Sequence, residues 1–107
     1  MKQYTVEITK EALTDMEQIY EYIAEVLRSP ENAIQQYKRI ANRIMKLSEF
    51  PERFPVMESE PEQEKGLRKM PVNHYMVFYV VKEDKVIVTN VLYSSADITA
   101  RLKGMSS

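Results

Sequence analysis

The residues best suited to chemistry lie in the last third of the chain, where basic side chains are grouped around a single histidine. Arginine and lysine can bind phosphate oxygens and stabilise developing negative charge. A histidine side chain such as that of His74 can act as a general acid or base. Together these groups suit metal-free RNA cleavage, in which a 2′-OH attacks its own phosphate. They are Lys65, Arg68, Lys69, His74, Tyr75, Tyr93, Ser94, Asp97, Arg101 and Lys103.

The same residues also have a simpler interpretation, a solvated basic strand edge beside an acidic loop, and composition alone favours it. His74 then only precedes a strand. The tyrosines are typical of core or rim packing rather than of platforms on which bases stack. The pair Ser94-Ser95 has no base next to it in the sequence, and a polar strand end explains it.

Composition excludes several kinds of catalytic and metal site. The chain has no cysteine, which excludes disulfides and thiolate metal sites. His74 is the only histidine, so a multi-histidine metal centre is excluded. With only Gly66 and Gly104, no glycine-rich loop can cradle a phosphate. We therefore expect no metal and no cofactor.

The length of 107 residues suits one domain, which we expect to span residues 1–107. Apolar residues make up 44% and charged residues 29%, typical of a soluble globular protein. The longest apolar run, from Tyr75 to Val81, is far shorter than the roughly 20 residues that cross a bilayer. The first residues show no secretory signal. We predict a cytoplasmic protein with no membrane association.

Charge is distributed unevenly, although the formal net charge is only −1. Acidic residues exceed basic ones up to residue 64, and basic residues exceed acidic ones after it. The overall balance gives no reason to expect nucleic-acid binding. The basic C-terminal part leaves room for a local anionic partner, with a chance split as the alternative.

Two amphipathic helices are predicted in the first half of the chain. Thr9 is a candidate N-cap for the first helix, while Ser29 can cap the second and Pro30 fits its first turn. The short connection predicts an antiparallel helical hairpin. The apolar stripes are Leu13, Met16, Ile19, Tyr20, Ile23, Val26 and Leu27, then Ala33, Ile34, Tyr37, Ile40, Ala41, Ile44, Met45 and Leu47. The opposite face of the first helix carries Asp15, Glu17, Glu21 and Glu25.

Strands are predicted on both sides of this hairpin. Residues 4–8 alternate and form a short strand, and residues 67–70, 74–81 and 86–93 are dense in strand-forming types. The last two form a hairpin with a polar turn. Between helices and strands, Phe50 and Phe54 are expected to pin a proline-containing turn to the core, and an acidic, aperiodic loop covers residues 58–64.

The predicted fold class is therefore α+β. An N-terminal strand is followed by the antiparallel helical hairpin and then by a three-stranded antiparallel run that completes one sheet. An antiparallel sheet with the hairpin on one face would bury every apolar surface.

Four segments, in this order and spacing, resemble the RelE/ParE superfamily of type II toxin–antitoxin toxins, in its plasmid-stabilisation branch. The resemblance implies a small bacterial toxin that a cognate antitoxin neutralises. RelE-like members cut mRNA on the ribosome, whereas ParE-like members inhibit DNA gyrase. The segments are Ile19-Tyr20-Glu21-Tyr22-Ile23-Ala24, residues 47–55 (LSEFPERFP), residues 66–79 (GLRKMPVNHYMVFY) and residues 91–98 (VLYSSADI).

The resemblance also assigns site residues. Arg68 occupies the family's basic position on the second strand, and Lys69 matches it more loosely. Met76 and Ala96 stand where RelE-like nucleases have arginines, which leaves ribosome-dependent endoribonuclease activity open. The candidate catalytic residues are Arg68, His74 and Tyr93; the candidate residues for binding nucleic acid or the target are Lys65, Lys69, Tyr75, Arg101 and Lys103.

Several alternatives follow from the resemblance. The target is either gyrase or ribosome-bound mRNA, or the chain is a degenerate homologue that only binds an antitoxin. We expect an amphipathic helix or an extended segment of the antitoxin to lie across the sheet or the helical hairpin. A homodimer and a heterotetramer with the antitoxin are both compatible with the sequence.

Overall fold

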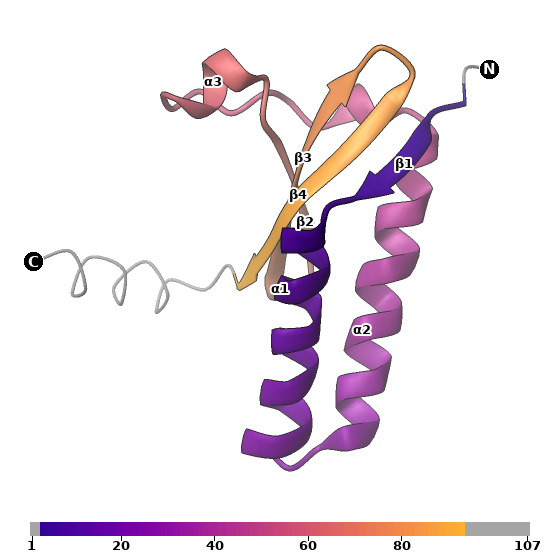
Figure 1. Cartoon of the computed structure of the whole chain (residues 1–107), viewed down its shortest axis with the longest axis vertical. Coiled ribbons are helices and arrows are strands. Elements are labelled where there is room, and N and C mark those ends of the chain that lie inside the picture. The colour runs from indigo at the N-terminus through magenta and orange to yellow at the C-terminus, as the bar shows by residue number, and fades with distance from the viewer. Residues whose placement is uncertain (1–2, 94–107) are drawn as a thin grey trace, which may run out of the picture.

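A computed structural model describes residues 3–93, and the predicted order of strands and helices is confirmed (Figure 1). A π-helical turn extends the first helix, and two short 3₁₀ turns follow the second. The elements are β1 (Thr5–Ile8), α1 (Lys10–Glu21), the π-helical turn (Tyr22–Val26), α2 (Pro30–Met45), 3₁₀ turns (Lys46–Ser48 and Pro51–Arg53), α3 (Glu62–Lys65), β2 (Arg68–Val72), β3 (Tyr75–Lys82) and β4 (Lys85–Tyr93).

Local sequence signals explain where the two helices of the hairpin begin and where the first one ends. The Thr9 hydroxyl accepts a hydrogen bond from the Ala12 N–H at 3.1 Å and so caps α1. Arg28 has a left-handed φ of 52°, which ends the first helix, and Pro30 opens α2. Ser29 precedes α2 as expected, but its side chain makes no capping hydrogen bond. The prediction that it caps is therefore wrong, and proline begins the helix without it.

The sheet has the strand order β1-β4-β3-β2. The predicted antiparallel run is confirmed: Val72 pairs with Tyr75 across β2 and β3, and Tyr75 pairs with Tyr93 across β3 and β4. The prediction of an entirely antiparallel sheet was wrong, because β1 lies parallel to β4. Parallel neighbours need a long crossover, and the chain between β1 and β4 supplies it.

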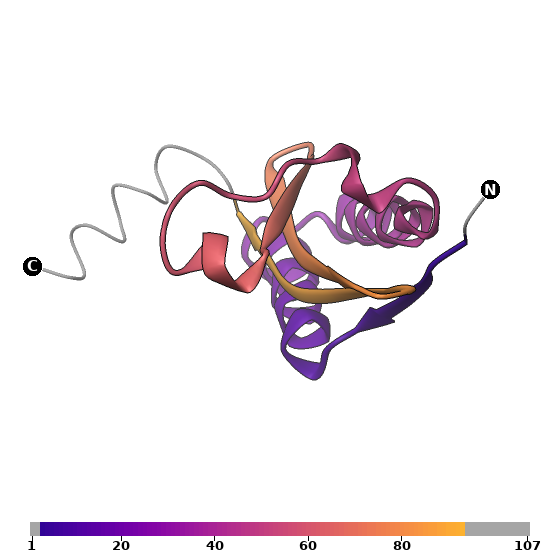
Figure 2. The same cartoon turned by 90° about the horizontal axis from the view of Figure 1, so that it is seen from above.

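One face of the sheet packs on α1 and α2, which lie side by side. Seen from above, α3 and its loop lie on the other side of the sheet from α2 (Figure 2). Tyr79 is fully buried at the centre of the core. The other buried apolar residues are Ala12, Met16, Ile23, Ala33, Ile40, Ile44, Leu47, Met70, Val72, Tyr75, Val77, Val86, Val88 and Val91.

Three residues of the predicted first stripe, Leu13, Val26 and Leu27, do not reach this core. Val26 is 64% exposed and Leu27 is 54% exposed. The π-helical turn takes more residues per turn than an α-helix, so it rotates these positions away from the α1 stripe. Leu13, Ile34 and Met45 are also largely exposed at the margins of their stripes.

The segment between α2 and β2 is built differently from the prediction. Phe50 adopts a left-handed φ of 49° and is 61% exposed, so it does not pin the turn, whereas Pro51 beside it is buried and Phe54 packs against the core. The acidic segment is not wholly a loop, because Glu62–Lys65 forms the single turn α3. Gly66 ends this turn with a φ of 70°. None of the helices in residues 3–93 combines the length and apolarity that a bilayer crossing requires.

Candidate functional site

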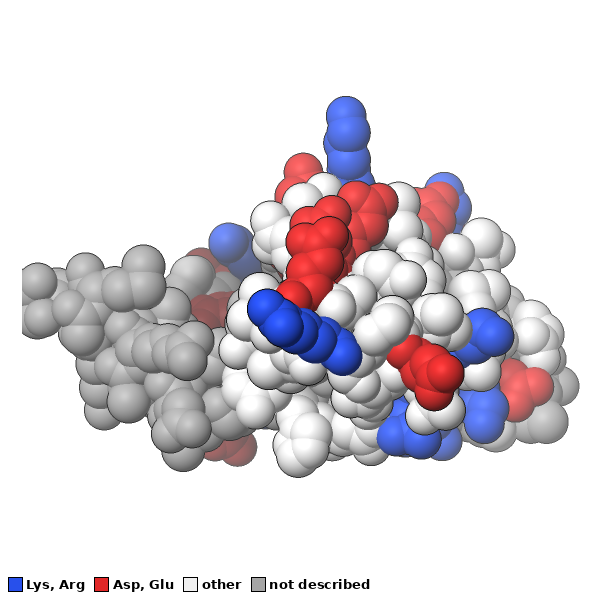
Figure 3. Space-filling view, turned by 90° about the horizontal axis from the view of Figure 1, so that it is seen from below, with Lys and Arg blue, Asp and Glu red and all other residues white. Residues whose placement is uncertain are grey.

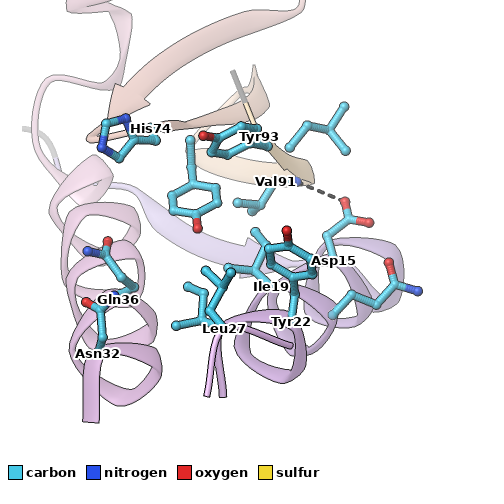
Figure 4. A pocket seen from close by; sticks show the side chains of 13 residues that line it. Asp15, Ile19, Tyr22, Leu27, Asn32, Gln36, His74, Val91 and Tyr93 are labelled. Carbon is cyan, nitrogen blue, oxygen red and sulfur yellow. Dashed lines mark hydrogen bonds between the residues drawn. The ribbon is translucent and has the colours of Figure 1, made fainter. Parts of the chain in front are cut away.

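A groove of about 510 Å³ lies where the ends of β3 and β4 meet the helical hairpin (Figure 4). Side chains from α1 and the π-helical turn form one wall, and α2 contributes two amides. The opposite wall comes from the turn before β3 and the last residues of β4. The lining residues are Asp15, Gln18, Ile19, Tyr22, Ile23, Leu27, Asn32, Gln36, His74, Tyr75, Val91, Leu92 and Tyr93.

Aromatic rings form the sheet wall of this groove. The Tyr75 and Tyr93 rings meet edge to face with centroids 5.5 Å apart, and the His74 ring lies 6.4 Å from that of Tyr93. The antiparallel register produces this cluster because Tyr75 begins β3 opposite the last residue of β4. Burial raises the pKa of Tyr75, and the neighbouring Tyr93 and Tyr22 hydroxyls raise it further. Tyr75 is therefore a neutral hydrogen-bonding group at physiological pH.

The β2–β3 turn is tied to α2 across the mouth of the groove. Asn73 has a left-handed φ of 55°, which asparagine tolerates in a tight turn. Its side-chain amide donates to Gln36 Oε1 at 3.2 Å. This bond fixes His74, the next residue, relative to the helical hairpin.

Asp15 forms the polar end of the groove and closes the free edge of β4. Strand β1 pairs only with the first residues of β4, up to Val88, so the later peptide groups of β4 have no neighbouring strand on that side. Asp15 Oδ2 accepts the Val91 N–H at 2.9 Å and the Asn90 side-chain amide at 3.2 Å. The Thr9 hydroxyl donates to the Thr89 carbonyl at 3.1 Å. Helix α1 therefore replaces a missing strand along this part of β4.

The sequence prediction placed Asp15 on the solvent face of the first helix, which is wrong. Asp15 lies three residues after buried Ala12 and four before Ile19, so it shares the face that packs on the sheet. The sequence signal for this role was a single carboxylate placed three and four residues from apolar residues of the buried helix face.

The groove presents exposed apolar surface with little charge. Leu27 is 54%, Tyr22 51%, Leu92 47% and Tyr93 40% exposed. Among residues 3–93, Asp15 is the only acidic residue that lines the groove, and no lysine or arginine of this part of the chain lines it. Apolar patches of this kind on small proteins mark sites where another molecule binds. The described lining suits an apolar segment that carries hydrogen-bond donors or positive charge.

The structure brings only part of the predicted site together. His74, Tyr75 and Tyr93 meet in the groove. Lys65 ends α3 on another part of the molecule, and Lys69 is exposed on β2. Strand alternation places the Lys69 side chain on the face opposite that of Arg68. The remaining predicted residues, Ser94, Ala96, Asp97, Arg101 and Lys103, lie outside the described residues.

Arg68 is bound to the protein's own backbone. Its guanidinium donates to the Phe54 carbonyl at 2.6 Å and to the Glu52 carbonyl at 3.2 Å, and it lies 3.8 Å from the Glu52 carboxylate. Arg68 pairs with Tyr79 across the β2–β3 ladder, whereas the aromatic cluster begins at Tyr75. Four residues of strand span about 13 Å. Arg68 and His74 therefore do not form one site in this structure.

Metal-binding residues do not gather in the part of the chain that the structure describes. There, no three His, Asp or Glu side chains lie close enough to hold an ion. The electrostatics of the groove therefore rest on Asp15, His74 and the tyrosine hydroxyls.

One sequence-family model and several solved structures match this chain. The sequence model described as "ParE toxin of type II toxin-antitoxin system, parDE" matches residues 6–98. A structure described as the chromosomal ParDE toxin–antitoxin system from P. aeruginosa is similar, with a TM-score of 0.73 and 20% identity. The match covers 87% of this chain and 98% of that one. No curated protein sequence gave a significant match.

Two further structures share the fold at lower similarity. One, from the RelBE2 toxin–antitoxin complex of Mycobacterium tuberculosis, has a TM-score of 0.63 at 18% identity and covers 87% of this chain and 93% of its own. A conserved hypothetical protein of Helicobacter pylori has a TM-score of 0.52 at 11% identity and covers 84% and 93%. The family match spans most of the sequence and agrees with the strand order. The chain therefore belongs to the ParE family of toxins of type II toxin–antitoxin systems.

Proposed function

We propose that this toxin arrests growth by binding a protein, DNA gyrase, rather than by cutting RNA. The observation that carries the proposal is the bonding of Arg68, whose guanidinium is held by two carbonyls and a carboxylate. A guanidinium that stabilises a phosphate in a transition state must be aimed at that phosphate. Membership of the ParE family supports the same target. We place the action in the cytoplasm.

The alternative is RelE-like cleavage of ribosome-bound mRNA. His74 and Tyr93 supply groups that can transfer protons, and their rings lie 6.4 Å apart. A nuclease also needs a cation near them for the developing phosphate charge. No lysine or arginine within the described part of the chain lines this groove, and Met76 stands where nuclease relatives carry an arginine. The proposed gyrase binding needs no such cation.

The groove is our proposed site for the cognate antitoxin. An amphipathic segment could bury apolar side chains against Leu27, Tyr22 and Leu92. A basic residue beside those side chains would lie near Asp15 and complement its charge. Such a segment folds on binding, which lets an intrinsically flexible antitoxin cover the toxin surface. We propose a heterotetramer of two such pairs as the assembly.

Binding of the purified antitoxin to a Leu27→Gln toxin tests this assignment. Leu27 is 54% exposed, so the antitoxin can bury about half of it, and losing that burial costs about 0.8–1.6 kcal/mol, or about a 4- to 15-fold weaker Kd. Phe50→Gln is the matched control, because Phe50 is just as exposed but does not line the groove. Equal affinities for Leu27→Gln and wild type, measured by calorimetry, would refute the groove as the antitoxin site.

Expression of the toxin without its antitoxin separates the two targets in cells. We expect growth arrest with intact transcripts and disturbed DNA supercoiling. Mapping of mRNA 5′ ends and gel analysis of plasmid topoisomers measure both effects in the same culture. New codon-positioned mRNA ends with unchanged topoisomers would favour the nuclease. Unimpaired growth would favour a degenerate homologue that only binds an antitoxin.

A further inference from the structure

The outer face of α2 carries a group of basic side chains. Residues 35–46 contain four basic side chains and no acidic one, although the first 64 residues are acidic overall. Lys38 and Arg39 are adjacent, and Arg43 and Lys46 follow at spacings of four and three, so the four side chains share one broad side of the helix. A shallow hollow of about 380 Å³ runs along this stripe and is lined by Gln35, Lys38, Arg39, Asn42, Arg43 and Lys46. We call these six residues the basic stripe.

Most acidic residues of the hairpin lie on α1, and α2 carries Glu31 in its first turn. Figure 3 shows a group of acidic side chains over the α1 side, while basic side chains gather at the lower right, over α2, with acidic side chains beside them. The nearest acidic residues after α2 are engaged elsewhere. Glu49 accepts from the Gln3 side chain at 3.3 Å, and Glu52 accepts from the Tyr4 hydroxyl and pairs with Arg68. Within residues 3–93, no ion pair reaches the basic stripe.

We propose that the basic stripe binds the phosphate backbone of nucleic acid. The stripe is about 16 Å long at 1.5 Å per helical residue, which matches about five steps of one DNA strand at 3.4 Å each. Arginine forks and lysine ammonium groups bind phosphate oxygens, and the Gln35 and Asn42 amides add neutral donors. The stripe contains no aromatic residue and no apolar wedge. Binding is therefore electrostatic and insensitive to sequence.

This inference goes beyond the proposed function, because it assigns a second surface with charge opposite to that of the groove. The groove offers Asp15 and apolar walls to a protein segment, whereas the basic stripe offers only cations and amides. The two surfaces can be occupied at once, since they share only the helix α2 and no residue. Its test uses neither gyrase, ribosomes nor antitoxin, so it can fail independently of the proposed function.

The experiment measures binding of the full chain to a 25-base-pair fluorescent DNA duplex as salt is varied. Four phosphate contacts predict a slope of log K against log salt of about −3.6. The affinity should then fall by roughly a hundredfold between 50 and 200 mM salt. A single-stranded RNA probe should bind with a shallower slope, about −0.7 per contact.

The matched variants isolate the stripe from overall charge. The stripe variant combines Lys38→Gln, Arg39→Gln, Arg43→Gln and Lys46→Gln, which preserve helix propensity. The control combines Lys10→Gln, Arg28→Gln, Lys82→Gln and Lys85→Gln, which change net charge equally outside the stripe. We expect at least a tenfold weaker Kd and a slope near zero for the stripe variant alone, with unchanged circular dichroism for both.

Three outcomes would overturn the proposal. The first is no measurable binding of wild type at 50 mM salt. The second is equal weakening in the stripe variant and the control, which would show a general charge effect. The third is stronger competition by polyglutamate than by unlabelled duplex at equal charge, which would indicate an acidic protein segment as the partner.

Discussion

At the scale of single residues, Arg68 and Tyr79 together hold the turn that follows α2. They face each other across β2 and β3, and their polar ends reach three successive parts of this turn. The Tyr79 hydroxyl donates to the Pro51 carbonyl at 2.5 Å, while Arg68 donates to the carbonyls of Glu52 and Phe54. Buried carbonyls need such partners. A basic residue at the family's expected site position thus has a structural role in this chain.

Because Tyr79 is buried, we expect the folded protein to lose stability at alkaline pH. Burial raises the pKa of Tyr79 to about 12, against smaller lowering effects from Arg68 and Arg53. The unfolded chain deprotonates this hydroxyl near pH 10 and the folded chain only near pH 12. The contribution is complete below pH 10 and is lost as pH rises through 12, so the free energy of unfolding should fall by about 2–3 kcal/mol across that window.

Tyr79→Phe tests this through urea unfolding at several pH values. We expect the variant to be less stable by about 1–2 kcal/mol at pH 7, because the Pro51 carbonyl loses its donor. Between pH 10 and 12 its stability should decline less than that of wild type. The same alkaline decline in both proteins would contradict the assignment to Tyr79.

Arg68→Ala and Lys69→Ala form a second test, because they remove neighbouring cations from opposite faces of β2. We expect Arg68→Ala to lower the free energy of unfolding by about 2 kcal/mol through the lost charged hydrogen bonds. Lys69 is exposed, so Lys69→Ala should change stability by less than about 0.5 kcal/mol. If Arg68→Ala abolished growth arrest at unchanged stability and abundance, Arg68 would be a catalytic or target-binding residue.

At the scale of elements, the helical hairpin does more than cover the sheet. Its first helix closes the edge that β1 leaves open, through Thr9 and Asp15. The opposite edge is protected by Pro71, which lacks an N–H, and by the Met57 N–H, which donates to the Leu67 carbonyl at 2.8 Å. Both edges are thereby made poor templates for pairing with another strand.

Asp15→Ala should expose the edge of β4. We expect a loss of about 1.5–3 kcal/mol in unfolding free energy, because one carboxylate oxygen serves two donors. The Val91 amide should also exchange with solvent faster than the Val77 amide in the sheet interior. Amide exchange measured by NMR checks both residues in one sample. Unchanged Val91 protection would show that β4 does not depend on α1 for its edge.

Periodicity predicted most elements but not how they meet. The strands and helices follow from alternation, apolar stripes and the Thr9 cap, which are local signals. The parallel pairing of β1 with β4, the π-helical turn that exposes Leu27, and the bonds of Asp15 and Arg68 depend on contacts distant in sequence. The candidate site was predicted only at His74, Tyr75 and Tyr93, because their register follows from a hairpin.

At the scale of the whole molecule, charge separates two surfaces. The groove holds a single carboxylate among apolar side chains, and the basic stripe lies on the outer face of α2. The net charge of −1 conceals both of them. The basic stripe lies within the first 64 residues, which are acidic overall, so the charge balance of the two sequence parts did not predict it. The two proposals together predict that partners of opposite chemistry bind this small toxin at different faces.

The most direct measurement of the central claim is the supercoiling of relaxed plasmid by purified DNA gyrase as the toxin is titrated. Gyrase binding predicts that supercoiling falls with toxin concentration and returns when the antitoxin is added. Ribosome-bound mRNA incubated with the same toxin preparation should remain uncut. Unchanged supercoiling at saturating toxin, with cutting of the ribosome-bound mRNA, would contradict the account.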